Sequence, residues 1–227
     1  NGTVFLRKKL VIYVCLFLLP AILFIIKTNP IKEKNEFAFQ IFYTLREDGY
    51  YVTGFKGYPQ NIEIPEVYEG KPVVGIGEKA FYNSYQLTSI IIPDSVTSIG
   101  NGAFENCHSL KQIRLSANIT RIGEHTFSGC RLESINIPDG VTSIGAYAFY
   151  GCDLKQINIP DGVAEIGEGA FRGCGKLKKI NIPDSVTKIE QFAFYYTGFY
   201  NTETNWDNGV LYIGKHLIEA NGEILSD

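Results

Sequence analysis

Between Gly75 and Phe194, one pattern of apolar residues returns every 22 or 23 residues. It reads Ile-Gly-x-x-Ala-Phe-x-x-Cys-x-x-Leu-x-x-Ile-x-Ile-Pro-x-x-Val-Thr. A sixth, weaker copy begins at Ile189, where glutamate replaces the glycine. A fixed period of this length is typical of a solenoid, in which each repeat packs only against its neighbours. The sequence therefore predicts a stack of about five full repeats.

Each repeat combines a short strand with turns. In the fifth copy, Ile180 and Ile182 alternate with polar residues, which is the period of a half-buried strand. Pro183 should end this strand, because proline has no N–H to donate to a ladder. At Ala170-Phe171 we expect a single helical or 3₁₀ turn. The predicted fold class is therefore α/β but mostly β.

Two residue types should form internal rows, because they occupy the same position in successive copies. The phenylalanine row comprises Phe81, Phe104, Phe127, Phe149, Phe171 and Phe194. The cysteine row comprises Cys107, Cys130, Cys152 and Cys174. Stacked side chains point in parallel, which disfavours disulfides, and the short C-x-x-C pairs of structural zinc sites are missing. We predict buried free thiols, with disulfides or a metal site as the alternatives.

The regions that flank the repeats are expected to cap the stack. Apolar residues alternate on both sides of the turn at 47–49, which indicates a β-hairpin. A second hairpin is predicted around Gly214. We accordingly assign 37–72 to an N-terminal cap, 73–198 to the repeats and 199–227 to a C-terminal cap.

The N-terminal residues resemble a secretory signal. Arg7-Lys8-Lys9 precedes an apolar run from Leu10 to Ile26, and a basic stretch followed by an apolar stretch is the usual order. The run is at the short limit for spanning a bilayer. We predict that residues 1–27 are a signal-anchor transmembrane segment or a cleaved signal peptide, followed by a linker at 28–36. The repeats would then be anchored to the membrane facing the cell exterior, or secreted.

The charge of the chain argues against nucleic acid as a partner. The formal net charge is -3. Residues 1–36 contain six basic and two acidic residues, a sum of +4, so the remainder carries -7. Phosphate contacts require clustered lysine and arginine, which an acidic domain does not offer.

No arrangement of residues points to catalysis. Aspartates recur at a fixed position, as Asp94, Asp139, Asp161 and Asp184. Such a row can hold a cation such as Ca²⁺, but an aspartate that forms a turn in each copy explains the row without any ion. The adjacent pair Cys107-His108 should point in opposite directions. We predict no catalytic residue, no metal and no cofactor.

Two sets of residues are candidates for a binding surface. The first occupies outward strand positions and comprises Arg114, Asn136, Asn158, Lys179 and Asn181. The second is an aromatic cluster that comprises Phe192, Tyr195, Tyr196, Phe199 and Tyr200. Aromatic residues are favoured at the centres of interfaces. Both sets also have a structural interpretation: the asparagines can bond along their row, and the aromatic cluster can pack against the terminal cap.

The repeats resemble the BspA-like (treponemal-type) leucine-rich repeat family. The resemblance rests on Ile-Pro-Asp-Ser-Val-Thr-Ser-Ile-Gly from Ile92 to Gly100, on Ala-Phe-x-x-Cys at 103–107, and on the later copies. It covers about 37–220. The resemblance implies a right-handed leucine-rich-repeat solenoid in a secreted or surface protein, in some members an adhesin, with no shared catalytic residues. Ser116-Ala117 departs from the pattern, so we expect a local irregularity at the second repeat.

These observations together favour a non-catalytic binding module at the cell surface or outside the cell. Its function would be adhesion or interaction with a protein or glycan partner, and the N-terminal segment would contact the membrane. The alternative is a passive spacer, or an accessory domain of a larger secreted protein or enzyme.

Overall fold

The computed structural model describes residues 39–207 and 210–220, apart from the side chains of 219 and 220, and all of them belong to one compact unit. The predicted signal segment and linker lie outside the described residues. Within them the regular elements are β-strands, with one 3₁₀ turn, η1 (Glu203–Asn205). No helix among these residues is long and apolar enough to cross a bilayer.

A β-hairpin begins the described chain, as predicted. Strands β1 (Gln40–Leu45) and β2 (Tyr50–Lys56) pair antiparallel. Next, β2 pairs in parallel with β5 (Lys71–Ile76), which also pairs with the short β4 (Val67–Tyr68). The hairpin turn requires Gly49, because its φ is +149° and a Cβ there would lie 2.6 Å from the carbonyl oxygen of Pro72. The hairpin thereby joins the first repeat through β5.

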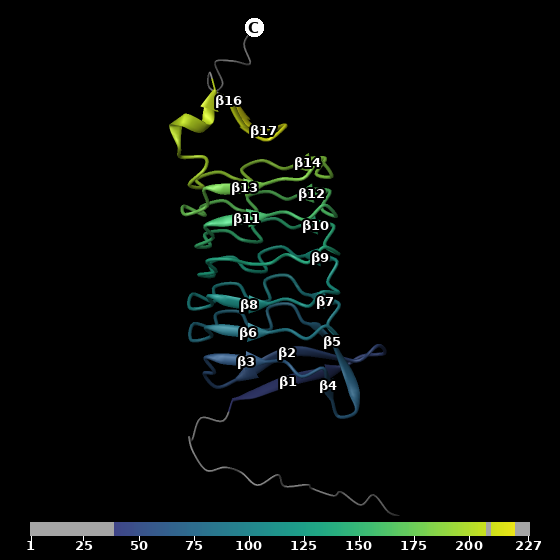
Figure 1. Ribbon diagram of the computed structural model, residues 1–227. Helices are drawn as coiled ribbons and strands as arrows, with labels where there is room; N and C mark the ends of the chain where they lie inside the picture. Colours follow the sequence, from purple (N-terminus) through teal and green to yellow (C-terminus); the bar gives the residue numbers. More distant parts are fainter. Residues whose placement is uncertain (1–38, 208–209, 221–227) are drawn as a thin grey trace, which may run out of the picture. The chain divides into compact units, whose positions relative to one another are not determined.

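The repeats stack their strands in two parallel columns, which can be followed in Figure 1. The first column contains β3 (Asn61–Glu63), β6 (Ser89–Ile91), β8 (Gln112–Arg114), β11 (Gln156–Asn158) and β13 (Lys179–Asn181). The second continues from β5 through β7 (Ser98–Ile99), β9 (Arg121–Ile122), β10 (Ser143–Ile144), β12 (Glu165–Ile166) and β14 (Lys188–Ile189). The weaker sixth copy is folded too, since β14 pairs with β12.

The third side of each repeat consists of turns rather than the helical turn expected at Ala170-Phe171. Gly169 (φ +55°) and Gly173 (φ +76°) flank these residues, and left-handed residues cannot continue a right-handed helix. The turns stack by hydrogen bonds from one repeat to the next. The N–H of Phe149 donates to the carbonyl of Ala170 (2.8 Å), and the other turns of the stack repeat this bond. The turn side is therefore continuous.

Both strand columns, in contrast, are interrupted around the third repeat. The first column has no strand between β8 and β11, and β7 and β9 belong to separate sheets. Hydrogen bonds from side chains replace the missing ladder bonds here. The Asp94 carboxylate accepts the N–H of Ala117 (3.0 Å), Ser116 Oγ donates to the carbonyl of Val96, and Asn101 Oδ1 accepts the N–H of Glu124 (3.1 Å). The irregularity expected from Ser116-Ala117 is present, and it extends into the next repeat.

The phenylalanine row forms the centre of the core. Its six rings are fully buried and stack with centroid distances of 5.2 to 5.6 Å. Phe55 of β2 adds a ring against Phe81 at 5.5 Å, so the N-terminal cap joins the same stack. Each ring therefore buries its faces only because neighbouring repeats are present.

The cysteine row lies beside the rings as four free, buried thiols. Each Sγ donates to the carbonyl of the phenylalanine in the repeat before it: Cys107 to Phe81 and Cys174 to Phe149, for example, both at 3.1 Å. The prediction of buried free thiols is confirmed, and the disulfide alternative is wrong for these residues. Described residues also contain no group of three or more potential ligands that could hold a metal ion.

The buried thiols should resist modification while the protein is folded. Burial raises the pKa of Cys174 to about 12 and raises those of Cys130 and Cys152, and the thiolate is the reactive species. A hydrogen bond with Cys130 lowers the pKa of Cys107, so this thiol is protected by its complete burial alone. In a Cys15→Ser variant at pH 8, we expect a thiol-specific chromogenic reagent to detect none of the remaining four cysteines until guanidinium is added, and then to detect all of them. Rapid release of one equivalent of chromophore by the native protein would show that one of these cysteines is accessible, and would contradict the buried row.

An antiparallel sheet ends the described chain. It contains β15 (Trp206–Asp207), β16 (Val210–Ile213) and β17 (His216–Ala220), and β16 and β17 form the second predicted hairpin. Ile213 is buried and belongs to the same core cluster as the repeats. The hairpin therefore covers the apolar end of the stack.

Candidate binding surfaces

The polar side chains of the strand columns are largely paired with one another. Arg114 Nη2 lies 2.9 Å from Asp94 Oδ2 across one repeat. Asn181 Nδ2 donates to Asn158 Oδ1 at 2.7 Å, so these two asparagines do bond along their row. Lys179 lies beside them at a shallow hollow. This face therefore already satisfies much of its hydrogen-bonding capacity within the protein.

A larger hollow of about 560 Å³ opens where the first column is interrupted. Arg114 and Asn136 line it together with two members of the aspartate row, Asp94 and Asp139. The N–H of Ala117 and the Arg114 guanidinium lower the pKa of Asp94 below its usual range. Asp94 is thus a hydrogen-bonded turn carboxylate in an ion pair, and this supports the structural interpretation of that residue.

The predicted aromatic cluster has a cap-facing part and an exposed part, which meet where the ring of Tyr200 lies 4.9 Å from that of Tyr195. Phe199 packs against the core, and the ring of Tyr200 lies 5.2 Å from that of Trp206, whose Nε1–H donates to the Tyr200 carbonyl at 2.8 Å. This part supports the C-terminal cap. Tyr196, by contrast, is 52% exposed and lies 4.0 Å from the ring of Tyr195. The cluster therefore provides both the cap packing and the exposed surface that we considered as alternatives.

The exposed part extends beyond the residues that sequence reasoning selected. The Arg172 guanidinium lies 5.7 Å from the Phe192 ring and 5.6 Å from the Tyr195 ring. It also interacts with the hydroxyl of Tyr147. Tyr147 continues the chain of contacts into earlier repeats. The resulting turn-side patch comprises His125, Tyr147, Tyr150, Arg172, Phe192, Tyr195 and Tyr196.

Tyr147 is the link between the ends of this patch. Its ring stacks on His125 at 5.2 Å and meets Tyr150 edge-on at 6.0 Å. Its hydroxyl donates to Glu168 Oε1 (2.6 Å), and this bond raises the pKa of Tyr147. A Cβ at Gly169 would lie 2.6 Å from the Tyr147 ring, so glycine is what allows the ring to lie over the next repeat. The patch is therefore held in place by specific contacts.

Backbone conformation sets the last repeat apart. Its Tyr196 has a φ of +57°, and the matching position in earlier repeats is occupied by asparagine or glycine, the residues that tolerate this region. Phe192, at another left-handed position, has a φ of +60°, but earlier repeats also place side chains there, as at His125 and Tyr147. Strained backbone of this kind persists where surrounding structure enforces it, commonly at functional sites. Two of the exposed aromatic residues are thus held in conformations that their side chains disfavour.

The residues that were missed lie at positions that vary between repeats. His125, Tyr147, Tyr150 and Arg172 come from three different repeats. His125 and Tyr147 share one repeat position with Phe192. Tyr150 and Arg172 share another with Tyr195. Glycine, lysine, glutamate and serine also occur at these two positions in other copies, which obscures the recurrence. The available signal was the recurrence of aromatic residues at these two positions, which does not by itself show that the rings meet.

Two parallel strand columns, a stacked phenylalanine core and turns of 22 or 23 residues define a leucine-rich-repeat solenoid. Residues 74–198 and 142–224 match the family described as "BspA type Leucine rich repeat region", in six copies. The chain belongs to this family. The family resemblance inferred from the repeat motif is therefore confirmed. Among curated proteins, no sequence matches the chain.

Solved structures of bacterial proteins share the fold. A leucine-rich repeat protein from Bacteroides ovatus is 30% identical with a TM-score of 0.56, over 74% of this chain and 57% of that one. A leucine-rich cell surface protein from Faecalibacterium prausnitzii is 38% identical with a TM-score of 0.57, over 62% of this chain and 37% of that one. A leucine-rich repeat protein from T. pallidum is 26% identical with a TM-score of 0.57, over 72% and 89%. The chain thus spans little more than half of the first protein and about a third of the second.

Proposed function

We propose that this chain is a non-catalytic binding module, displayed on the cell surface or secreted, and that its turn-side patch contacts a protein or glycan partner in adhesion. The observation that carries the proposal is the exposed aromatic surface around Tyr195 and Tyr196, which is built partly from strained residues. Tyrosine with a neighbouring arginine is the composition favoured at the energetic centres of interfaces.

The surroundings of the candidate nucleophiles and bases support a non-catalytic role. Cys107, the candidate nucleophile beside His108, is fully buried, and its Sγ donates to the carbonyl of Phe81 at 3.1 Å, so it does not face a substrate. His125 stacks on Tyr147, and His108 stacks on Tyr85 with its Nδ1–H donated to the carbonyl of Gly129. These two histidine rings therefore act as packing partners for aromatic side chains.

Surface location is supported by two further observations. The sequence at 1–27 has the order of a secretory signal. The similar protein from F. prausnitzii is described as a cell surface protein. Anchoring through the N-terminal segment would leave the repeats free to meet partners outside the cell.

A binding screen against matrix proteins and glycans tests the proposal. We expect saturable binding, and we expect the double variant Tyr195→Ala/Tyr196→Ala to weaken it about tenfold or more, the equivalent of about 1.4 kcal/mol. The matched control is Asn158→Ala/Asn181→Ala, which removes a hydrogen bond on the strand face and should retain binding. Loss only in the asparagine variant would place recognition on the strand face. No binding by a folded wild-type chain would favour the spacer function.

The strain at Tyr196 leads to a separate expectation for stability. Asparagine tolerates the left-handed region, so Tyr196→Asn should leave the free energy of unfolding unchanged or raise it by up to about 1 kcal/mol while binding weakens. Chemical denaturation measures the first effect. Tyr196→Ala serves as the control, because it removes the ring without relieving the backbone and should be less stable than the asparagine variant. A less stable asparagine variant would show that the tyrosine is kept for packing.

A further inference from the structure

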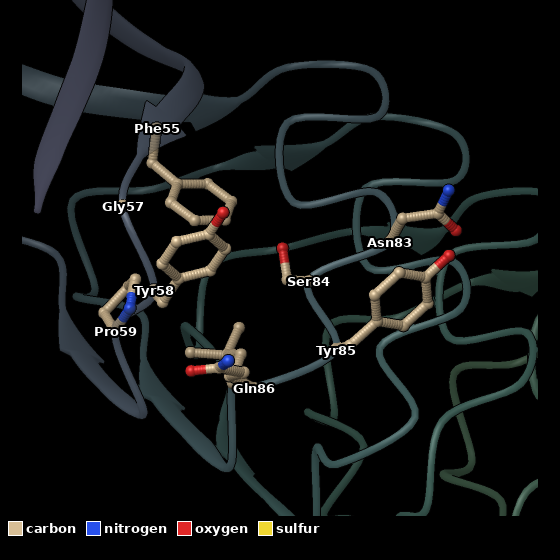
Figure 2. A pocket seen from close by; sticks show the side chains of 9 residues that line it. Phe55, Gly57, Tyr58, Pro59, Asn83, Ser84, Tyr85 and Gln86 are labelled. Atoms are coloured by element: carbon tan, nitrogen blue, oxygen red, sulfur yellow. The ribbon is translucent and has the colours of Figure 1, made fainter.

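A third, smaller hollow lies at the other end of the stack, far from the turn-side patch in sequence. It has a volume of about 150 Å³ and forms between the loop that follows β2 and the turn of the first repeat. Figure 2 shows the rings of Phe55 and Tyr58 on one side, Tyr85 on the other, and Ser84 between them. The pocket is lined by Phe55, Gly57, Tyr58, Pro59, Asn83, Ser84, Tyr85, Gln86 and Leu87.

Two of the aromatic side chains that line the pocket are held in position by stacking on neighbouring rings. Phe55 stacks on Phe81, the first ring of the phenylalanine row, at 5.5 Å. Tyr85 stacks on His108 at 5.5 Å, and the Nδ1–H of His108 donates to the carbonyl of Gly129 at 2.9 Å. The walls are therefore fixed before any ligand arrives, and preorganised walls reduce the entropic cost of binding.

The loop on the Tyr58 side is also constrained. Gly57 has a φ of +99°, and a Cβ there would lie 3.0 Å from the Cα of Phe39. Pro59 fixes the backbone one residue after Tyr58. This holds the loop beside the turn of the first repeat while Tyr58 itself stays 71% exposed. An exposed ring on a fixed loop can contact a ligand with little loss of backbone conformational entropy.

The polar groups around the pocket are neutral. They are the amides of Asn83 and Gln86 and the two tyrosine hydroxyls, together with the hydroxyl of Ser84, whose proton is already donated to the carbonyl of Phe81 at 2.6 Å. No charged side chain lines the pocket. Asn83 Oδ1 is buried and has no hydrogen-bond partner within the described part of the chain. Buried acceptors are normally satisfied, so this amide has an acceptor still to be used. Amides and hydroxyls both donate and accept, which suits ligands rich in hydroxyl groups.

We infer that this pocket binds one ring of a neutral saccharide between Tyr58 and Tyr85. Flat aromatic rings present an electron-rich face to the C–H groups of a sugar, and the amides and hydroxyls can pair with its hydroxyl edge. The uncharged lining disfavours acidic sugars and charged peptides. The volume is below the roughly 300–1,000 Å³ of sites that enclose a drug-sized ligand, so a single ring is the unit that fits.

A proline-rich peptide is the competing occupant, because aromatic walls also bind polyproline helices. Such recognition uses an extended groove, since a polyproline II helix advances about 3.1 Å per residue and its docking motif covers several residues. This pocket offers one compact hollow with neutral polar groups around it, which matches a sugar ring better. The saccharide site does not depend on the proposed role of the turn-side patch.

The test is binding of the full 227-residue chain to an array of immobilised neutral glycans built from hexoses and N-acetylhexosamines. Acidic glycans and an oligoproline peptide are included as probes. We expect neutral glycans to bind and Tyr85→Ala to weaken this binding about tenfold or more. Tyr82→Ala is the matched control, because Tyr82 is an exposed tyrosine of the same repeat that does not line the pocket.

Each other outcome overturns the inference. No neutral glycan bound by the folded wild-type chain would exclude the site, as would binding that survives both Tyr58→Ala and Tyr85→Ala. Preferential capture of the oligoproline peptide would assign the pocket to a peptide. Sugar binding that is lost in Tyr195→Ala/Tyr196→Ala but not in Tyr85→Ala would place the sugar site on the turn-side patch. That result would overturn the pocket proposal while supporting the proposed function, so the two proposals can fail separately.

Discussion

Replacing Phe149 with alanine is expected to cost about 3–5 kcal/mol of unfolding free energy, the range for removing a buried aromatic ring. The ring is fully buried and stacks on Phe127 at 5.4 Å and on Phe171 at 5.2 Å. A ring in the middle of the stack belongs to two interfaces between repeats, and stability in a solenoid is shared between nearest neighbours. Because whole domains are stable by only about 5–15 kcal/mol, this loss is large.

Urea denaturation followed by circular dichroism measures this loss. We expect a lower midpoint and a broader transition, since weakening one central interface lets the two halves of the stack unfold separately. Phe42→Ala is the matched control: Phe42 lies on β1 and is 43% exposed, so its removal should cost about 1 kcal/mol or less. Similar midpoints for the two variants would show that the phenylalanine row contributes little.

Replacing Gly100 with alanine is the second change with a large expected effect. A Cβ at this position would lie 2.4 Å from the backbone nitrogen and 2.7 Å from the Cα of Glu78, in the repeat before it. Backbone atoms cannot rotate away as a flexible side chain can, so the strands must separate. The bond from the Gly100 N–H to the carbonyl of Ile76 (2.8 Å) would be strained. We expect a loss of about 3 kcal/mol.

Gly175→Ala provides the control for this prediction. Gly175 has no atom within 4 Å of an added Cβ and does not have a positive φ. Alanine there should leave stability unchanged or raise it, because it restricts the unfolded chain. Thermal melting of both variants decides the question, and equal melting temperatures would contradict the close approach. Glu190 replaces the glycine only in the last repeat, where the second strand column ends.

Most of the architecture could be predicted because the environment repeats with the sequence. A residue that returns every 22 or 23 positions has the same neighbours in each turn, so the solenoid and its family follow from the period. The sites could not be predicted in the same way. Tyr147 and Arg172 were missed because their contacts join different rows of different repeats. Only their coordinates show that Arg172 meets Phe192 and Tyr195 and also interacts with Tyr147.

The pocket at the first repeat illustrates the same limit. Tyr58 belongs to the loop before β3 and Tyr85 to the turn after Phe81, and neither position repeats as an aromatic residue along the chain. Their approach depends on how the hairpin joins the stack, with Phe55 placed against Phe81. A pairing across 27 residues of non-periodic sequence leaves no pattern to recognise.

The sequence by itself determined the solenoid, its buried phenylalanine and cysteine rows and its hairpin caps, because these depend on periodic apolar residues that every turn buries alike. Tertiary structure alone decided where the strand columns break, since side chains such as those of Asp94 and Asn101 replace ladder bonds there. It also decided which exposed aromatic residues form one surface. Surface residues are under no periodic packing constraint, so their meeting depends on the three-dimensional path of the chain.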